Sequence, residues 1–512
     1  MIEVKLVRGP WSSCGATRAS GYAHLGDRFL RADAIAALLD ACPVDAAWQQ
    51  TLSRLNGCFA VATHRGARLL AGVDRIRSIP LFWSSRGEDY CVSDDACLAL
   101  AASGSTEPNA TANAEFPLTG YVTGEETLYS GVRQLQAGSV LSFDEACSDG
   151  PQRAPYYEFR HREFFTDDTG ALVARLDEVH GRVFRRLIAS LEGRPIVVPL
   201  SGGYDSRLIA VGLRALGVKD VVCYSYGVPG NWESRVSREL ADYLGFRWEF
   251  VPYSAERWRA WASTEAFREY FRSAGNLTSV PHVQDWPAVF ELGRQGKLPP
   301  AGVFIPGHTG DFVTGGHVPK WYVRRSRVSR RELLDSIFRA HYSLWDWPSG
   351  RERELAALFD RRIEGIIGPV PDCSPEEAAD RYERWELQER QAKFICNSLR
   401  VYEGFGHEWR LPWYDAELID FWARVPLGLR TGRRLYLDYV TQRQALPVTD
   451  PNRDRGTVGR WLVKGVERVG LRPAAKRAQR ALRRWRWRHE YESSPLAWYG
   501  LVDRDLFART YT

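Results

Sequence analysis

The alternation of apolar and helical segments after residue 195 constrains the fold of this chain most strongly. Short apolar runs are separated by turns that contain glycine and by segments whose apolar residues recur at helical spacing. This alternation predicts parallel strands joined by right-handed helical crossovers in an open, doubly wound α/β sheet. We expect strands at 196–200, 221–226, 248–251 and 303–305, and helices at 207–216 and 233–244.

The segments on either side of this sheet have different patterns. A helix capped by Asp168 is predicted to run to residue 191, and Ser374 with Pro375 should begin a long helix that ends near residue 402. Because 512 residues exceed what one hydrophobic core supports, we expect two domains, at 1–150 and 165–512. The first should consist of short strands joined by glycine turns, for example at 59–63, 68–73, 90–92 and 139–143.

Cysteine usage and charge exclude several classes of protein. The nine cysteines include no Cys-x-x-Cys pair, which argues against a disulfide framework or zinc site and favours the reducing cytoplasm. The sequence contains neither a secretory signal pattern nor an apolar run of about 18 residues. Residues 453–488 carry thirteen Lys or Arg against two acids, so the remainder is acidic despite the net charge of +6. We therefore expect no nucleic-acid partner, while 453–488 forms either a solvated helix or a peripheral contact with a membrane or polyanion.

The turn after the first strand of the predicted sheet has the composition of a phosphate-binding loop. Ser201, Gly202 and Gly203 are small enough to let backbone N–H groups approach an anion, and the following helix directs its positive end to the same place. Two glycines alone are equally typical of a structural strand-to-helix turn. Asp205 and Ser206 make this loop specific for pyrophosphate chemistry.

Several segments together resemble the asparagine synthetase family, in the order in which that family has them. The string LSGGYDS at 200–206 resembles the PP-loop of N-type ATP pyrophosphatases, and GHTGD at 307–311 with Gly315 and Gly316 resembles the family's second acidic loop. The matches cover about residues 55–430. The remaining matching segments are LNGCFA at 55–60, DR at 74–75 with SIPLF at 78–82, the glycine-containing stretch 120–138, and EWRLPWYD at 408–415.

This resemblance implies an ATP-dependent ligase. A substrate carboxylate would attack the α-phosphate of MgATP to give an acyl-adenylate and pyrophosphate, and ammonia or an amine would then form the amide. The resemblance also implies an αββα sandwich of the N-terminal-nucleophile hydrolase type for the first domain. It places Mg²⁺ on Asp205 and Asp311. It places ATP on Leu200, Ser201, Gly202, Gly203, Asp205, Ser206, Tyr226 and Gly307.

The first domain departs from the glutamine-dependent members of this family. Those members have a cysteine nucleophile directly after the initiator methionine, where this sequence has Ile2. Cys14 would replace that nucleophile only after cleavage of the chain before it. We therefore expect an amidase-inactive first domain and direct use of ammonia or an amine.

The second domain departs from the family at its catalytic positions. His308 stands where asparagine synthetases have glutamate and is predicted to deprotonate the attacking amine, the alternative being a histidine that only stabilises the turn. Glu389 is predicted to support that base. Lys464 is the candidate for the family's late catalytic lysine, with Arg453 and Arg455 as alternatives.

The substrate itself is less constrained. His282, Gln284 and Asp285 are predicted to contact it, although a capped turn before a helix also explains these residues. The motifs are similar to asparagine synthetase-like proteins of surface-polysaccharide synthesis, which suggests a sugar carboxylate. Intramolecular amide formation, as in β-lactam synthetases or lasso-peptide cyclases, and a nucleotide-binding pseudoenzyme are the alternatives. The oligomeric state stays open.

Overall fold

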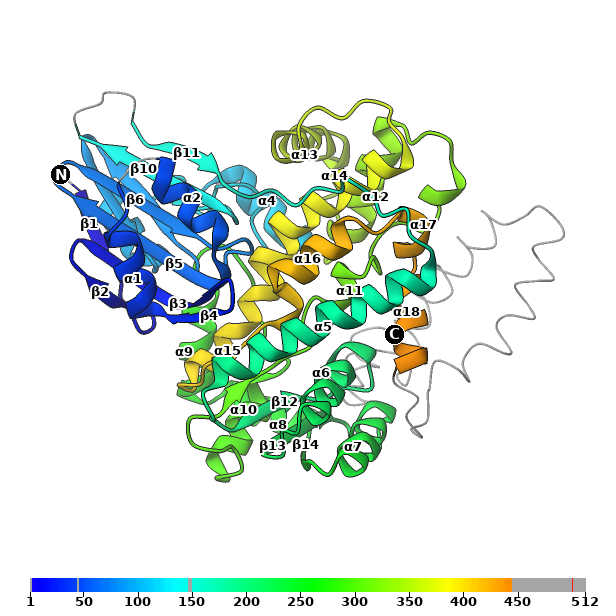
Figure 1. The fold of residues 1–512 in the computed structure, drawn as a ribbon. Coiled ribbons are helices and arrows are strands. Elements are labelled where there is room, and N and C mark those ends of the chain that lie inside the picture. Colours follow the sequence, from blue (N-terminus) through cyan, green and yellow to red (C-terminus); the bar gives the residue numbers. More distant parts are fainter. Residues whose placement is uncertain (1, 44–45, 146–149, 444–499, 501–512) are drawn as a thin grey trace.

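The two halves of the chain fold as separate layered units that pack against each other. The computed structural model describes residues 2–43, 46–145, 150–443 and 500. In Figure 1 the strands of the first domain lie on one side, in blue, and the parallel sheet of the second lies at the bottom, in green. No helix in these described ranges is long and apolar enough to cross a membrane.

The first domain is built around two sheets. Its strands are β1 (Ile2–Lys5), β2 (Ser12–Cys14), β3 (Thr17–Leu25), β4 (Arg28–Arg31), β5 (Asn56–Arg65), β6 (Arg68–Val73), β7 (Phe82–Arg86), β8 (Asp89–Ser93), β9 (Arg133–Gln134), β10 (Ser139–Asp144) and β11 (Gln152–Pro155). The smaller sheet has the order β1-β8-β7-β9. The larger has the order β11-β10-β6-β5-β3-β2, and β4 pairs with β3. The predicted strands are confirmed as parts of β5, β6, β8 and β10.

Helices cover both sheets of this domain. They are α1 (Ala32–Asp40), α2 (Ala46–Arg54), α3 (Ala96–Ser103) and α4 (Ala110–Thr119). Apolar side chains of α1 and α2 form one core with the larger sheet, a second core lies between the sheets, and α3 packs on the smaller sheet. The αββα sandwich is therefore confirmed. No helix of this domain was predicted from the sequence. The helix α3 is apolar all round and α4 contains Pro117, so neither has a clear amphipathic stripe, whereas the stripes of α1 and α2 could have been recognised.

A parallel sheet forms the centre of the second domain. Its strands are β12 (Ile196–Pro199), β13 (Val221–Gly227), β14 (Arg247–Pro252) and β15 (Val303–Phe304), in the order β14-β13-β12-β15. Helices α6 (Tyr204–Ala215) and α7 (Trp232–Leu244) connect the first three strands. The next strand, β15, is added on the other side of β12 and is parallel to it, so the direction in which strands are added across the sheet reverses there. This topology confirms the doubly wound prediction and places a switch point between the carboxyl ends of β12 and β15.

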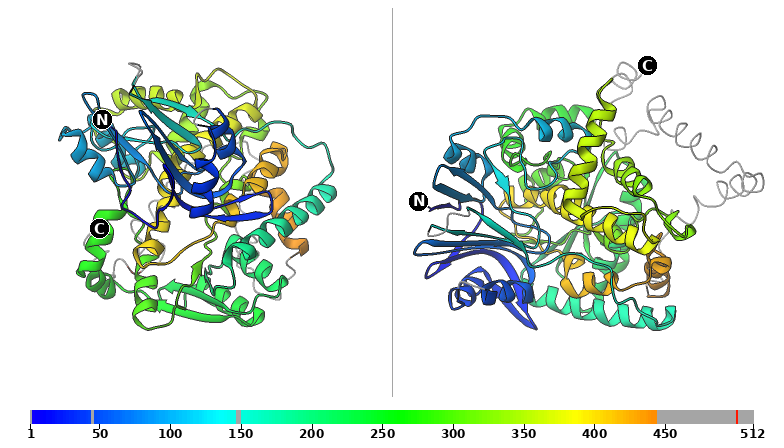
Figure 2. Two further views of the ribbon diagram at one scale, coloured as in Figure 1. Left: turned by 60° about the vertical axis from the view of Figure 1, so that its left-hand side comes forward. Right: turned by 90° about the horizontal axis from the view of Figure 1, so that it is seen from above.

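The other helices of the second domain surround this sheet (Figures 1 and 2). Asp168 caps α5, as predicted, by accepting a hydrogen bond from the N–H of Ala171. Ser374 caps α14 in a capping box with Glu377. The helices are α5 (Thr169–Leu191), α8 (Ala255–Ala262), α9 (Glu265–Ala274), α10 (Trp286–Arg294), α11 (Gly310–Val313), η1 (Tyr322–Arg324), α12 (Arg330–His341), α13 (Glu352–Ile367), α14 (Pro375–Glu386), η4 (Pro412–Tyr414), α16 (Ala416–Ala423), α17 (Leu427–Arg430) and α18 (Arg434–Arg443).

The helix that begins after Ser374 is not regular to residue 402. It changes to a π-helix, η2 (Leu387–Ile395), then to a 3₁₀ turn, η3 (Cys396–Leu399), and returns to α15 (Arg400–Gly404). A π-helix shifts the side chains around the axis relative to an α-helix, and such turns are frequent at functional sites. Here the change of winding decides which side chains of this helix face the sheet and which face the first domain.

The segment 276–280 fastens the second domain to the first. Asn276 and Leu277 both have left-handed backbone, with φ of 45° and 56°. The side chain of Asn276 accepts a hydrogen bond from the N–H of Ala96, and the carbonyl of Leu277 accepts one from Leu128. Strained backbone persists where its surroundings fix it. This segment, which precedes the predicted substrate residues, therefore docks the domains.

Candidate active site

The phosphate loop joins β12 to α6 at the switch point. The N–H of Ser201 donates to the Ser206 hydroxyl at 3.1 Å, and the N–H of Gly203 donates to the Ser201 hydroxyl at 3.2 Å. A Cβ on Gly202 would lie 2.5 Å from the Trp232 ring, so a larger residue does not fit there. Gly203 gives the first turn of α6 no side-chain cap, whereas Asn231 caps α7. The positive end of α6 is thus left for another acceptor.

The second loop packs directly on the first. A Cβ on Gly307 would lie 2.7 Å from the backbone N of Ser206, and one on Gly310 would lie 2.6 Å from Cγ of Asp205. Thr309 has a left-handed backbone, with φ of 75°, and its buried hydroxyl donates to Gln391 at 2.8 Å. Glycine is therefore required at 307 and 310, and the loop holds Asp311 beside Asp205.

Asp205 lies in the first turn of α6, which begins three residues before its predicted start. Its carboxylate forms an ion pair with Arg433, and the two side chains are 17% and 18% exposed. Burial and the nearby charge of Asp311 raise the pKa of Asp205, against the opposing effect of Arg433. Arg433 also donates from Nε to the Thr314 hydroxyl at 2.8 Å.

Asp311 has a different cation. Nε2 of His317 lies 2.7 Å from Asp311 Oδ2, and Nδ1 of the same ring contacts the fully buried Glu386. Although burial opposes protonation, the charges of Glu386 and Asp311 raise the pKa of His317 to about 10. Burial acts against ionisation of Asp311 as well, but His317 holds the pKa of that carboxyl well below its ordinary value. His317 is therefore an imidazolium at neutral pH.

The two acids suit a magnesium ion that also binds phosphate. Mg²⁺ prefers hard oxygen ligands and usually binds one or two carboxylates together with substrate phosphates. Asp205 and Asp311 come from adjacent loops at the open end of the sheet, and Asp311 is 52% exposed at its side chain. No group of three or more His, Cys, Asp or Glu side chains within the described ranges forms a metal cage. Two carboxylates alone would hold the ion weakly, and a bound phosphate would complete its set of oxygen ligands.

His308 and His282 lie near each other beside this loop. Nδ1 of His308 is 3.2 Å from the Ser398 hydroxyl, and that hydroxyl donates to the carbonyl of Ile395 at 2.6 Å. Burial lowers the pKa of His308 to about 3 and that of His282 to about 4, and the charge of a protonated His282 contributes to the low pKa of His308. Nδ1 of His282 is buried and has no partner among the described residues. Both rings are neutral at physiological pH, and His308 is a weaker base than expected.

Asp285 does not face the site as a substrate residue would. Its carboxylate is buried and accepts hydrogen bonds from the hydroxyls of Tyr224, at 2.9 Å, and Tyr402, at 2.7 Å. It precedes α10 without capping it. Gln284 accepts the hydroxyl of Tyr253 through its backbone carbonyl. Of the three predicted substrate residues, the structure brings His282 alone close to His308.

The other predicted site residues lie in different parts of the molecule. Tyr226 lies at the carboxyl end of β13, stacked on Tyr253 with ring centroids 5.1 Å apart. Glu389 is fully buried, 2.6 Å from Nζ of Lys393, and accepts the N–H of Gly124 from the first domain. It therefore joins the domains, while Glu386 from the preceding turn is the carboxylate that reaches the Asp311 loop. Lys464, like the basic segment 453–488, lies outside the described residues.

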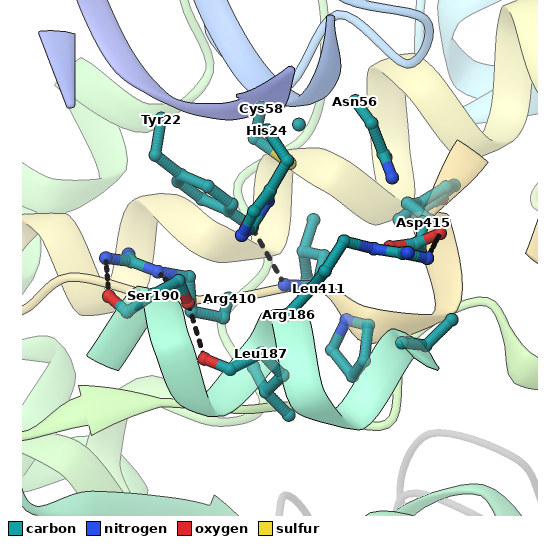
Figure 3. Close-up of a pocket in the computed structure, with 14 residues that line it drawn as sticks. Tyr22, His24, Asn56, Cys58, Arg186, Leu187, Ser190, Arg410, Leu411 and Asp415 are labelled. Carbon is teal, nitrogen blue, oxygen red and sulfur yellow. Dashed lines mark hydrogen bonds and ion pairs between the residues drawn. The ribbon is translucent and has the colours of Figure 1, made fainter. Parts of the chain in front are cut away.

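A hollow at the domain junction is separate from the switch point (Figure 3). Tyr22 and His24 of the first domain face Arg186 of α5 and the segment 410–415 across it. Arg186 forms a bidentate pair with Asp415, and Arg410 lies 4.2 Å above the Tyr22 ring. The charged groups of this hollow are satisfied by one another. The EWRLPWYD motif therefore positions the two domains, and its residue Arg410 also pairs with β15 through the backbone.

Three residues of the site were not predicted, namely Arg433, His317 and Glu386. His317 directly follows Gly315 and Gly316, and a search for a cation beside that motif would have found it. Arg433 comes from a turn far along the chain, and the sequence prediction assigned the supporting acid to Glu389, one turn beyond Glu386. Their pairing with the two acids depends on tertiary contacts that no local pattern contains.

Two family models match this chain. The model described as asparagine synthase matches residues 183–436, and the glutamine amidotransferase domain matches residues 38–157. A curated relative, the probable glutamine-hydrolysing asparagine synthetase of Acanthamoeba polyphaga mimivirus, is 40% identical over 76 residues. That match covers 14% of this chain and 13% of the relative, so the chain aligns with a small part of the relative's length.

Two solved structures are similar over larger regions but only weakly. The allosteric regulatory enzyme of purine biosynthesis is 14% identical, with 46% of this chain and 59% of that chain covered and a TM-score of 0.19. Glutamine phosphoribosylpyrophosphate amidotransferase from B. subtilis, complexed with ADP and GMP, is 12% identical, with 59% and 64% covered and a TM-score of 0.21. At these TM-scores the likeness does not define a fold. The matched family models, each in its own half and together including both acidic loops, place the chain in the asparagine synthetase family.

Proposed function

We propose that this protein is an ATP-dependent carbon–nitrogen ligase that adenylates a carboxylate and transfers the acyl group to ammonia or an amine. The observation that carries the proposal is the meeting of Asp205 and Asp311 at the switch point, beside an uncapped helix terminus. Ligands of doubly wound sheets bind at such points, and an uncapped helix terminus favours anions. Family membership supports the same activity.

Each group has a part in the proposed reaction. The phosphate loop and α6 orient the triphosphate, and Mg²⁺ on Asp205 and Asp311 supplies positive charge against the phosphate oxygens. A carboxylate oxygen attacks the α-phosphorus, the bond to the bridging oxygen breaks, and pyrophosphate leaves. The amine nitrogen then attacks the acyl carbon and AMP leaves. His308, neutral and close to the loop, accepts the proton that the amine loses.

A sugar acid is the proposed carboxylate. The resemblance of the SGGYDS loop to asparagine synthetase-like proteins of polysaccharide synthesis supports that substrate class. Ammonia is the simplest donor, because Ile2 offers no thiol nucleophile at the position of the family's cysteine. Within the described residues, Ile2 is a buried member of the core between the two sheets of the first domain.

The test is exchange of labelled pyrophosphate into ATP, measured with Mg²⁺ and a panel of carboxylates that includes uronic acids and amino acids. Exchange that depends on one acid supports adenylation, and incorporation of ¹⁵N-ammonia into an amide of that acid completes the proposal. Asp205→Asn is the matched inactive control. Nucleotide binding without exchange for any acid would identify a pseudoenzyme and contradict the proposed ligase.

A further inference from the structure

The ion pair between Arg433 and Asp205 is the starting point, and the inference rests on the proposed function. An oxygen of Asp205 that accepts a guanidinium N–H is not free to coordinate a metal ion. The planar fork of arginine binds carboxylates and phosphates with the same geometry. When a magnesium nucleotide occupies the switch point, the metal ion therefore competes with Arg433 for Asp205. The phosphates of the nucleotide then offer Arg433 a second anion to bind.

The side chain of Arg433 is held at several points and is 18% exposed. Nε donates to Thr314 at 2.8 Å, and the guanidinium carbon lies 4.4 Å from the centre of the Tyr436 ring. Gly432 and Arg433 are consecutive left-handed residues, with φ of 72° and 63°. A backbone with this strain directs a side chain that a regular turn would place elsewhere.

The Gly-Gly pair of the second loop makes room for this turn. A Cβ on Gly315 would lie 2.6 Å from the carbonyl oxygen of Arg430, and one on Gly316 would lie 3.1 Å from Cδ of Arg433. Glycine is therefore needed at 315 and 316 because it lets the stem of Arg433 pass beside the loop that holds Asp311. The same loop supplies Thr314, so both acids and the anchor of Arg433 come from adjacent segments.

His317, the other cation of the site, is not placed to move. Both of its ring nitrogens are engaged, Nε2 with Asp311 and Nδ1 with the buried Glu386. Glu386 is fully buried, so a displaced His317 would leave an unpaired carboxylate in the interior. Asp205 lies nearer to solvent and would be neutralised by the arriving metal. Displacing His317 would therefore cost more free energy than displacing Arg433.

We propose that Arg433 is a transferable counter-ion, which pairs with Asp205 in the nucleotide-free protein and donates to the leaving pyrophosphate when the magnesium nucleotide binds. Nε stays on Thr314 in both states. Arg433 thus supplies from this turn the phosphate-binding cation that the sequence assigned to Lys464. It is a binding residue for the leaving group and also competes with Mg²⁺ before the nucleotide arrives.

Calorimetric titration of the full chain with Mg²⁺ alone, and with inorganic pyrophosphate at saturating Mg²⁺, tests this inference. Arg433→Met should bind Mg²⁺ alone roughly three- to tenfold more tightly, because Asp205 is released. The same variant should bind pyrophosphate about 10- to 100-fold more weakly, because a charged hydrogen-bond donor is lost. Arg434→Met, which changes an exposed arginine one position along, is the control and should leave both affinities unchanged.

Opposite changes in the two affinities support the inference, and a parallel fall of both would overturn it by giving Arg433 a structural role. If Arg433→Met does not fold, Thr314→Val removes the anchor of Arg433 together with the hydrogen bond that this hydroxyl donates to the carbonyl of Gly310, and should weaken pyrophosphate binding more than Mg²⁺ binding. Equal affinities of Thr314→Val and wild-type protein for pyrophosphate would also overturn it. Wild-type protein that binds no magnesium pyrophosphate would contradict the proposed function itself, and this inference with it.

Discussion

The two halves of the molecule bury carboxylates in opposite ways. In the first half, Asp74 accepts hydrogen bonds from the backbone of Phe59 and Ile76, both at 2.9 Å, and from Ser78, and no cation pairs with it among the described residues. Burial raises the pKa of Asp74 to about 6. In the second half, Asp205 and Asp311 each pair with a cation from another segment. Asp74 closes a turn, whereas the other two acids pair with cations, of which Arg433 is the one that an incoming ligand can displace.

This difference explains what the family motifs do in each half. The motif around Asp74 holds the loop between β6 and β7, and its bonds are complete within the domain. The motifs around Asp205 and Asp311 converge on an open end of a parallel sheet. Similarity to a family therefore preserves a scaffold in the first half and a reaction site in the second.

Removing the acids one at a time should separate these roles most clearly. Asp205→Asn and Asp311→Asn should each lower carboxylate-dependent pyrophosphate exchange about 1000-fold, because a magnesium ligand is lost. Asp74→Asn should destabilise the protein but leave exchange by the folded fraction within about threefold. Exchange rates corrected for the folded fraction by circular dichroism provide the comparison. Equal losses in all three variants would abolish the distinction between the two halves.

The contact between the two acidic loops should be nearly as sensitive. Gly310→Ala places a Cβ 2.6 Å from Cγ of Asp205 and should weaken binding of magnesium pyrophosphate about 100-fold by pushing the loops apart. Gly365→Ala, at a helical glycine of α13 with open space around it, should bind normally and gain up to about 1 kcal/mol of stability. Calorimetry of both variants measures this. Normal pyrophosphate binding by Gly310→Ala would show that the close packing of the loops has no role.

Asp285 belongs to the second half but should behave like Asp74. Burial raises the pKa of Asp285 to about 6, above its unfolded value near 4, so the folded protein binds the proton more tightly. Its contribution to stability is therefore complete below about pH 4 and is lost as the pH rises through about 6. Relative to Asp285→Asn, wild-type protein should lose about 2 kcal/mol of unfolding free energy between pH 4 and pH 7. Urea melts of both proteins measure this, and a pH-independent difference would contradict a buried, protonatable carboxyl.

The smallest expected effect concerns His308. Its pKa of about 3 makes it neutral but weakly basic, so His308→Gln should slow amide formation only about tenfold. Pyrophosphate exchange should be unchanged, because adenylation precedes the proton transfer. Separate assays of exchange and of amide product distinguish the two steps. Parallel losses in both assays would assign His308 to nucleotide binding or to the structure of the loop.

Much of the fold could be predicted from local patterns. The strands and helices from residue 168 to 252 were predicted almost to the residue, because their apolar periodicity and caps are strong. The first acidic loop was predicted from its composition and its position after a strand, and the second from its resemblance to the family's motif. The first domain was predicted less completely, since α3 and α4 have no clear amphipathic face and the short amphipathic patterns of α1 and α2 were not assigned to helices.

The cations of the site could not be predicted from local sequence patterns. Arg433 reaches Asp205 because a left-handed turn directs it there, and Glu386 contacts the site from the last turn of α14 through His317. Asp285 has the pattern of a polar loop residue, but hydrogen bonds from Tyr224 and Tyr402, on two other elements, hold its carboxylate in the core. Each case depends on residues more than 60 positions apart. Local sequence patterns contain no information about such pairs.

The central claim is that Asp205 and Asp311 together bind a divalent metal with the phosphates of a nucleotide. Electron paramagnetic resonance of Mn²⁺, titrated with α,β-methylene-ATP into wild-type protein, Asp205→Asn and Asp311→Asn, tests it most directly. The account predicts a bound Mn²⁺ signal in wild-type protein that requires the nucleotide analogue, and its loss in both variants. A signal of equal strength in the three proteins would contradict the account.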